Sequence, residues 1–205
     1  MQRHKMFDVD VADESLTGFA SNVTGASFTL TTTATSDGLA HQVSIRNDSV
    51  TDHSGKTITL VGTDANDKPL TEVVTAPGTS ATVESTGYFK TLTSATPSAT
   101  IGADTFDIGW VDEVATPTYM LNKYNRTAPN IHVDVTGTIS FTVQECFRDL
   151  QRGEAEVWMN VSALASKSAD TTAQISLGAV AVRLIVDSYS SGAELQMVIT
   201  QADNG

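Results

Sequence analysis

The stretch from Lys56 to Trp110 consists of short runs of alternating apolar and polar residues, each closed by Gly, Pro, Asn or Asp. Ile58 and Leu60 alternate with threonines, which is the period of a strand with one buried face. The run stops at the turn residues 62–69 and resumes from Leu70 to Thr75. Further runs cover residues 81–85, 88–93 and 106–110. Short strands at this spacing are typical of an antiparallel all-β sandwich or barrel.

The residues after 130 continue this pattern. Ile131, Val133 and Val135 alternate with polar residues, and after Thr136-Gly-Thr138 the alternation resumes at 139–143, which predicts a hairpin. Later runs predict strands at 156–160, 180–186 and 195–199. The apolar sides of these strands should be buried, and they include Phe141, Val143, Leu184, Val186 and Ile199.

The chain is long enough for two domains of about 100 residues each. Before the central stretch, we expect a loop at 16–25 and strands at 27–33 and 42–46, separated by the turn Asp37-Gly38. Strand period is lost at 114–130, which carries Pro117 and Pro129. We interpret 114–130 as a linker, with a short helical turn at 119–124. The sequence therefore predicts two antiparallel β-sandwich-like modules, residues 1–113 and 131–205.

The first fifteen residues allow three interpretations. Phe7, Val9 and Val11 alternate with acids, as in a strand, but no neighbouring run offers a hairpin partner. Residues 1–15 are therefore an assembly arm that pairs with a neighbouring subunit, an edge strand of the first module, or a frayed terminus. Residues 1–5 are basic, but no apolar run follows, so we expect no signal peptide.

Composition excludes several classes of protein. The net charge is −12 and the pI is about 4.5, which argues against binding nucleic acid or an anionic membrane surface. No stretch approaches the roughly 20 apolar residues of a membrane helix. Cys146 is the only cysteine, so it forms no intrachain disulfide, and we expect a buried structural thiol because no histidine accompanies it locally.

Several stretches resemble, in order, a β-rich family of tailed-bacteriophage virion proteins. They are Thr57–Pro69, Glu72–Thr75, Tyr88–Thr93, Phe106–Trp110, Val135–Gln144, Trp158 and Val182–Val186. The resemblance spans about Val43 to Thr200, and its motifs are turns and strands. Asp67 stands where the family usually has Gly, so the turn type is expected to differ. The resemblance implies a virion structural protein, assembled in the host cytoplasm, and carries over no catalytic residue.

No set of residues predicts a metal, cofactor or catalytic site. Asp64, Asn66 and Asp67 could form a calcium loop, but the twelve-residue calcium pattern is incomplete, and a β-turn is the better interpretation. The carboxylate pairs Asp112/Glu113 and Glu154/Glu156 could serve a glycosidase, yet solvated turn residues explain them as well. The four histidines share no metal-ligand spacing, so we expect surface or turn positions for His4, His41, His53 and His132.

Three functions remain open at this point. The first is a non-enzymatic virion component that decorates or cements the capsid, or covers the head–tail neck, through contacts with capsid, portal, neck or tail proteins and with its own copies. The second is a carbohydrate-binding or adhesion module that stacks a sugar on Trp110 or Trp158, although Trp158 fits a core position better. The third is a hydrolase. Four glycosylation sequons, at Asn22, Asn47, Asn125 and Asn160, mean little without a secretory signal.

Overall fold

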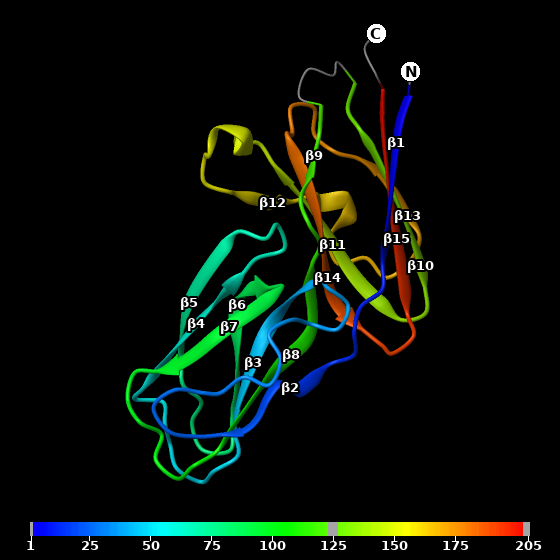
Figure 1. The fold of residues 1–205 in the computed structure, drawn as a ribbon. Helices are drawn as coiled ribbons and strands as arrows, with labels where there is room; N and C mark the ends of the chain where they lie inside the picture. Colours follow the sequence, from blue (N-terminus) through cyan, green and yellow to red (C-terminus); the bar gives the residue numbers. More distant parts are fainter. Residues whose placement is uncertain (1, 123–126, 203–205) are drawn as a thin grey trace. The chain divides into compact units, whose positions relative to one another are not determined.

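A computed structural model of the chain describes residues 2–122 and 127–202, without the side chains of residues 2–4 and 202. The chain divides into two compact units, which we describe separately (Figure 1). The terminal unit contains residues 1–11 and 115–205, and the inserted unit contains residues 12–114. The described residues form antiparallel strands with only two short 3-10 turns, η1 (Leu150–Arg152) and η2 (Ser162–Leu164). The protein is therefore all-β, with sandwich-like units, as the alternation predicts.

The terminal unit is built from two groups of strands. One sheet has the order β1 (Gln2–Val9), β15 (Glu194–Ala202), β10 (Asn130–Thr136) and β13 (Thr171–Gln174). In the other group, β12 (Trp158–Asn160), β11 (Ile139–Cys146) and β14 (Ala181–Tyr189) lie in order, and β9 (Tyr119–Met120) also pairs with β14. The five residues predicted to be buried are all at most 2% exposed, so the predicted core face is confirmed.

The predicted hairpin at 131–143 is wrong. β10 pairs with β13 and β15, whereas β11 pairs with β12 and β14, so the two strands belong to different sheets. The intervening Gly137 has a φ of 83°, which lets the chain turn from one sheet to the other. The alternation is the same in either arrangement, because each strand buries one apolar face. Sequence pattern alone therefore could not separate a hairpin from a crossover.

The inserted unit also has two groups of strands. β6 (Thr82–Phe89), β3 (Ala40–Asn47) and β8 (Phe106–Ala115) lie in order, and β2 (Ser15–Val23) pairs with β8. A three-stranded sheet has the order β5 (Pro69–Thr75), β4 (Thr57–Thr63) and β7 (Thr91–Pro97). The β4–β5 hairpin has an unbroken register from Thr57↔Thr75 to Thr63↔Pro69, as its turn residues predict. The side chains packed between these strands include Phe19, Val43, Ile45, Ile58, Leu60 and Phe106.

Two other local predictions in the inserted unit are wrong. Residues 16–25 were expected to form a loop, but most of them form β2, whose small and polar side chains hide its strand character. Residues 27–33 were expected to form a strand, yet that region makes only isolated bridges from Phe28 to Ala95 and from Ala34 to Thr91. Phe28 is nevertheless buried and stacks on Phe106 at 5.7 Å between ring centroids, and its backbone N–H donates to the Ala95 carbonyl at 3.2 Å.

The unit boundaries differ from the module bounds expected from sequence. β1 pairs with β15 over its whole length, from Gln2↔Ala202 to Val9↔Leu195, so it belongs to the terminal unit and not to a module of residues 1–113. The segment interpreted as a linker begins inside β8, and Tyr119–Met120 forms β9 where a helical turn was expected. The last two residues of that expected turn, Lys123 and Tyr124, lie outside the described residues.

We predict that Leu184→Ala lowers the free energy of unfolding by roughly 2–5 kcal/mol, because the side chain is fully buried and its removal leaves a cavity. Urea unfolding followed by fluorescence or circular dichroism would measure the change. Leu177→Ala is the matched control, since Leu177 is 61% exposed in the same unit and its truncation should change stability by less than about 0.5 kcal/mol. Equal effects of the two substitutions would contradict the assignment of the core.

Candidate functional site

A hollow of about 410 Å³ lies on one face of the first sheet of the terminal unit. Its polar lining comes from three adjacent strands and the residue after β1: Asp8, Asp10, Asp134, Thr136, Glu194 and Gln196. All six positions are even-numbered, and the odd-numbered neighbours Val9, Val133 and Leu195 are buried. Because successive residues of a strand point to opposite faces, the polar residues share the face that turns away from the core.

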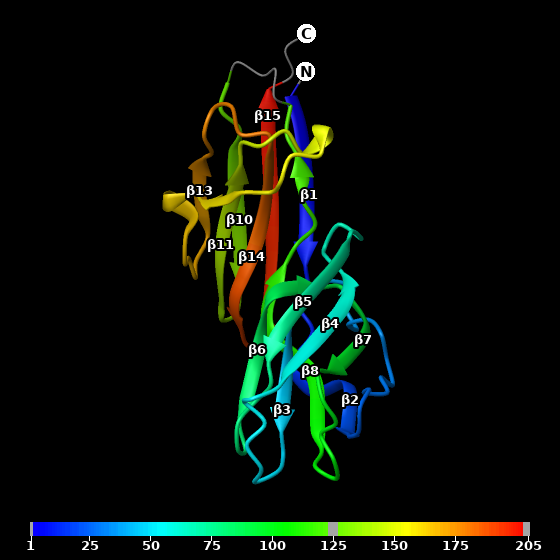
Figure 2. The same cartoon turned by 90° about the vertical axis from the view of Figure 1, so that its left-hand side faces the viewer.

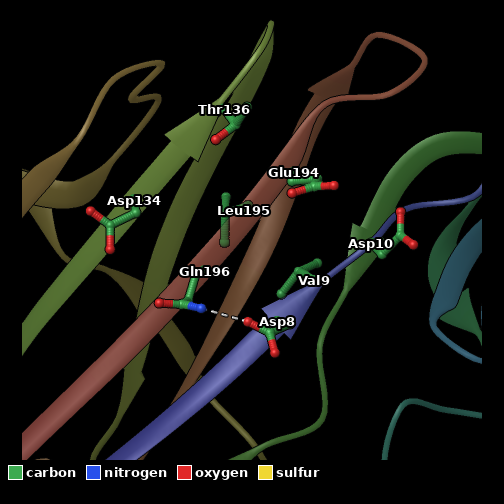
Figure 3. Close-up of a pocket in the computed structure, with 8 residues that line it drawn as sticks. All are labelled: Asp8, Val9, Asp10, Asp134, Thr136, Glu194, Leu195 and Gln196. Atoms are coloured by element: carbon green, nitrogen blue, oxygen red, sulfur yellow. Dashed lines mark hydrogen bonds between the residues drawn. The ribbon is translucent and has the colours of Figure 1, made fainter.

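The register fixes how these side chains line up. Gln196 stands opposite Asp8 on one side and opposite Asp134 on the other. Figure 3 shows the three in a row across the strands, with the Gln196 amide donating to the Asp8 carboxylate at 2.7 Å. Asp134 is also 2.8 Å from His132 Nε2. The hollow thus presents four carboxylates and no lysine or arginine among its lining residues.

This arrangement favours binding of positive charge or of hydrogen-bond donors. A metal centre is not indicated, because no group of three or more His, Cys, Asp or Glu within residues 2–122 and 127–202 is placed to hold an ion. Sequence analysis missed the hollow, although each of its strands showed acids alternating with apolar residues. It is formed by β1, β15 and β10, which come from distant parts of the chain, so only the topology brings the acids together.

Two of the histidines are buried: His53 begins the 53–56 turn, which fits the expectation of a turn position, but His41 lies on a strand, contrary to the expectation of a surface or turn position. His41 on β3 is fully buried, with Nδ1 at 2.8 Å from the Val111 carbonyl and Nε2 at 2.8 Å from Asp37 Oδ2. Both partners are acceptors, so both ring nitrogens must donate, as only the imidazolium form can. The same Asp37 oxygen also accepts the Ala12 N–H at 2.8 Å. The pair therefore fastens the start of the inserted unit close to β8.

The electrostatics around Asp37 follow from these bonds. Burial acts to raise the pKa of Asp37, but hydrogen bonds from His41, Ala12 and Leu39 and the charge of His41 outweigh it and lower the pKa to about 2. The pKa of Asp112, which follows Val111 on β8, is shifted in the opposite direction. Burial raises the pKa of Asp112, and the nearby charge of Asp13 adds to this increase.

His53 is bonded in the other protonation pattern. It is 3% exposed, and its Nε2 lies 2.9 Å from Asp104 Oδ2 while its Nδ1 lies 3.1 Å from Lys56 Nζ. Lysine can only donate, so Nδ1 accepts and the neutral Nε2–H form satisfies both contacts. Lys56 also donates to the Thr100 carbonyl at 2.8 Å. This group ties the 53–56 turn to the loop before β8, which explains the burial structurally.

The remaining histidines do not form a site. His132 is partly exposed on β10, as its outward position predicts, and pairs with Asp134. The side chain of His4 lies outside the described part of the chain.

The ring of Trp110 is buried, and Arg183 covers one face of the Trp158 ring. Trp110 is 7% exposed, packs edge-on against Phe19 at 5.1 Å, and donates from its indole N–H to the Asp13 carbonyl at 3.1 Å. Trp158 was expected in the core but is only half-buried. The guanidinium of Arg183 lies 4.5 Å from its ring centroid, and the residue packs beside the buried thiol of Cys146. Cys146 is fully buried, as predicted.

The suspected calcium loop is a hydrogen-bonded turn. Asp64 Oδ1 accepts the backbone N–H groups of Asn66 and Lys68 at 2.8 and 2.9 Å, so this oxygen already has two donors. Asp67 has a φ of 60°, the left-handed conformation that glycine adopts most easily. Asp67 therefore occupies a conformation that glycine would adopt without strain.

The carboxylate pairs proposed for a hydrolase have structural partners. Asp112 accepts the Glu14 N–H at 2.9 Å, and Glu113, its neighbour in β8, points to the other face of that strand. Glu154 accepts the Asp149 N–H at 3.0 Å, and Glu156 accepts the Trp158 indole N–H at 3.0 Å. The Asn125 sequon lies outside the described residues.

Comparison with known proteins identifies no family. No family model and no curated protein matches the chain. Among solved structures, the major capsid protein P2 of bacteriophage PM2 aligns over 98% of this chain and 100% of its own, with 10% identity and a TM-score of 0.20. The VP2 subviral particle of infectious bursal disease virus aligns over 98% and 72%, with 10% identity and a TM-score of 0.21. Scores this low carry no argument about fold family or function.

The described residues include no helix long and apolar enough to span a membrane.

We predict that acid weakens the inserted unit through Asp37. A carboxylate whose pKa is lowered by folding stabilises the native state above its unfolded value of 3.8, and this stabilisation is lost as the pH falls toward about 2. The ionised Asp37 stabilises the native state by about 2 kcal/mol. Urea unfolding between pH 5 and 2 should therefore show a shallower pH dependence for Asp37→Asn. Asp134→Asn, which alters a half-exposed His–Asp pair, should keep the wild-type slope, and a wild-type slope in Asp37→Asn would refute the assignment.

At the β4–β5 turn, we predict that Asp67→Gly leaves stability unchanged or raises it by up to about 1 kcal/mol, because glycine adopts the left-handed conformation without strain. The exposed contact with Lys90 that is lost contributes little. Thermal unfolding would measure the effect. Asp67→Val is the contrasting variant and should destabilise, and a more stable valine variant would show that the turn has another conformation.

Proposed function

We propose that this chain is a non-enzymatic structural component of a tailed-phage virion, which decorates or cements the capsid or the head–tail neck through protein–protein contacts. The observation that carries the proposal is the ordered set of stretches that resemble tailed-phage virion proteins. These stretches fall on the β4–β5 hairpin, on β6–β7, on β8, on β10–β11, at Trp158 and on β14. They are elements of the sheets and their turns.

Two glycines within these stretches allow neighbouring strands to approach closely. A side chain at Gly62 would collide with the Thr91 carbonyl, so this glycine allows β7 to approach β4. A side chain at Gly109 would collide with the Ser15 carbonyl, so this glycine allows β2 to approach β8. The resemblance is therefore to a β scaffold, and it carries over no catalytic residue.

The surface chemistry fits the same role. A net charge of −12 keeps free copies soluble and apart before assembly. Contacts with capsid, portal, neck or tail proteins would then come from several weak interfaces acting together. The same charge disfavours nucleic acid and anionic membranes as partners. The alternative of a carbohydrate-binding module loses support, because Trp110 is buried and the ring of Trp158 carries Arg183.

Purified phage particles that encode this chain provide the test. We expect mass spectrometry to detect the protein at a fixed ratio to the major capsid or portal protein, and cryo-electron microscopy to place it on the capsid surface or the neck. Treatment of the particles with high salt is the control for loosely adsorbed host protein. Absence of the chain from salt-washed particles would overturn the proposal. Glycan-array binding that Trp158→Ala abolishes would favour the carbohydrate alternative, because Trp158 is only half-buried.

A further inference from the structure

We propose that copies of this chain join by strand exchange, in which β1 of one copy takes the place of β1 on strand β15 of another. This inference rests on the proposed structural function and names its partner, a second copy of the chain. It starts from the place of β1 in the terminal unit. β1 is an edge strand there, although the whole inserted unit separates it in sequence from the next strand of that sheet (Figures 1 and 2).

The attachment of β1 is mostly a backbone ladder. Eight residues pair in register with β15, from Gln2↔Ala202 to Val9↔Leu195. Of the side chains described in β1, only Val9 is buried, while Lys5, Met6 and Asp8 are exposed and Met6 keeps 51% of its surface. Little apolar surface therefore holds β1 to its own copy, and a departing β1 leaves the hydrogen-bonding edge of β15 open.

That edge fits β1 better than it fits another strand. Asp8 accepts the hydrogen bond from Gln196 at 2.7 Å, Phe7 packs edge-on against Tyr119 at 5.4 Å, and Val9 fills a buried position opposite Leu195. A second copy of β1 reproduces each of these contacts. Because exchanged and unexchanged forms have the same contacts, exchange requires little free energy beyond that of association.

The connection after β1 is short and held at its far end. Residues 10–14 have no regular structure, and three of them are bonded within the inserted unit. The Ala12 N–H donates to Asp37, the Asp13 carbonyl accepts from Trp110, and the Glu14 N–H donates to Asp112. Only Asp10 and Val11 lie between the end of β1 and this anchored segment. A short connection limits how a strand can fold back on its own copy and favours pairing with a neighbour.

Strand exchange would place the acidic hollow at the contact between two copies. It spans the seam between β1 and β15, with Asp8 and Asp10 on one side and Glu194 and Gln196 on the other. In exchanged copies the two sides come from different chains. The hollow is then a joint between subunits, completed only when the second copy supplies its first strand.

Disulfide trapping with full-length protein tests the exchange. Met6 and Val198 are register partners, so Met6→Cys on one tagged population and Val198→Cys on another can join only if β1 of one copy lies on β15 of the other. We expect a mixture that has been allowed to assemble and is then oxidised to give the mixed dimer as its main product on a non-reducing gel. The double variant should form a disulfide in every assembly state. Cys146 is fully buried and should stay unreacted, as the wild-type protein would verify.

The opposite edge of the same sheet offers a matched control. His132 and Thr172 are register partners on β10 and β13, two strands that are not expected to exchange. A mixture of His132→Cys and Thr172→Cys should give no mixed dimer, while the double variant closes within one chain.

Three results would overturn the inference. The first is that the Met6→Cys/Val198→Cys double variant forms its disulfide only within one chain and the mixture of single variants gives no dimer. The second is that the double variant forms no disulfide at all. The third is that Met6→Cys alone forms dimers, which would indicate edge-to-edge pairing of two β1 strands. The trapping is scored on purified protein, whereas the virion function is scored on particles without added cysteines. Failure of one is therefore distinguishable from failure of the other.

Discussion

The main-chain ladder along β15 is the interaction on which the terminal unit depends. β15 is paired on both sides, by β1 from the start of the chain and by β10, and these two ladders bring its apolar residues onto one buried face. The hydrogen bond from Gln196 to Asp8 joins residues 188 positions apart in sequence. Distant pairings of this kind cost more loop-closure entropy than local ones, which slows the formation of such a sheet. The inserted unit combines the local β4–β5 hairpin with a distant pairing of its own, because β2 at its start pairs with β8 at its end.

Buried charge performs a different task in the inserted unit. His41 and His53 are both nearly inaccessible, yet one is surrounded by two acceptors and the other by an acceptor and a lysine. Hydrogen bonding thus dictates an imidazolium in the first case and a neutral ring in the second. A buried cation next to Asp37 is tolerable because the carboxylate compensates its charge. In a chain with an excess of acids, such pairs fasten loops without adding exposed cations.

The sequence predicted those features of the fold that depend on neighbouring residues. Alternation located most strands and the buried faces of residues such as Leu184 and Phe141, and the Gly, Asp and Asn residues after Val61 located the β4–β5 turn. Prediction from the sequence failed where a strand could pair with any of several strands that are distant along the chain. Both sides of Gly137 have the pattern of a hairpin, but they belong to different sheets. The segment around Gly18 lacks apolar alternation, and β2 forms there because Gly109 lets it approach β8.

The candidate site escaped prediction for the same reason. Asp8, Asp134 and Glu194 each alternate with apolar residues, and each by itself is an ordinary solvated position. Only the strand order β1, β15, β10 gathers them on one face. Conversely, the residues that the sequence analysis named as candidate site residues have structural roles within their own units. Asp64 closes a turn, Trp110 fills the inserted unit, and Glu156 holds the indole of Trp158.

Charge also constrains how copies of this protein can join. Flat contact between two surfaces of a protein with net charge −12 would bring acids together, and the repulsion would have to be offset by apolar burial or by a basic partner. Exchange of β1 avoids much of this cost at the joint. Asp8 meets Gln196 in the exchanged form as it does within one chain, so the joint creates no new acidic pair. The directional bonds of the ladder then supply the attraction, and the remaining acidic surface keeps assembled copies from sticking at other places.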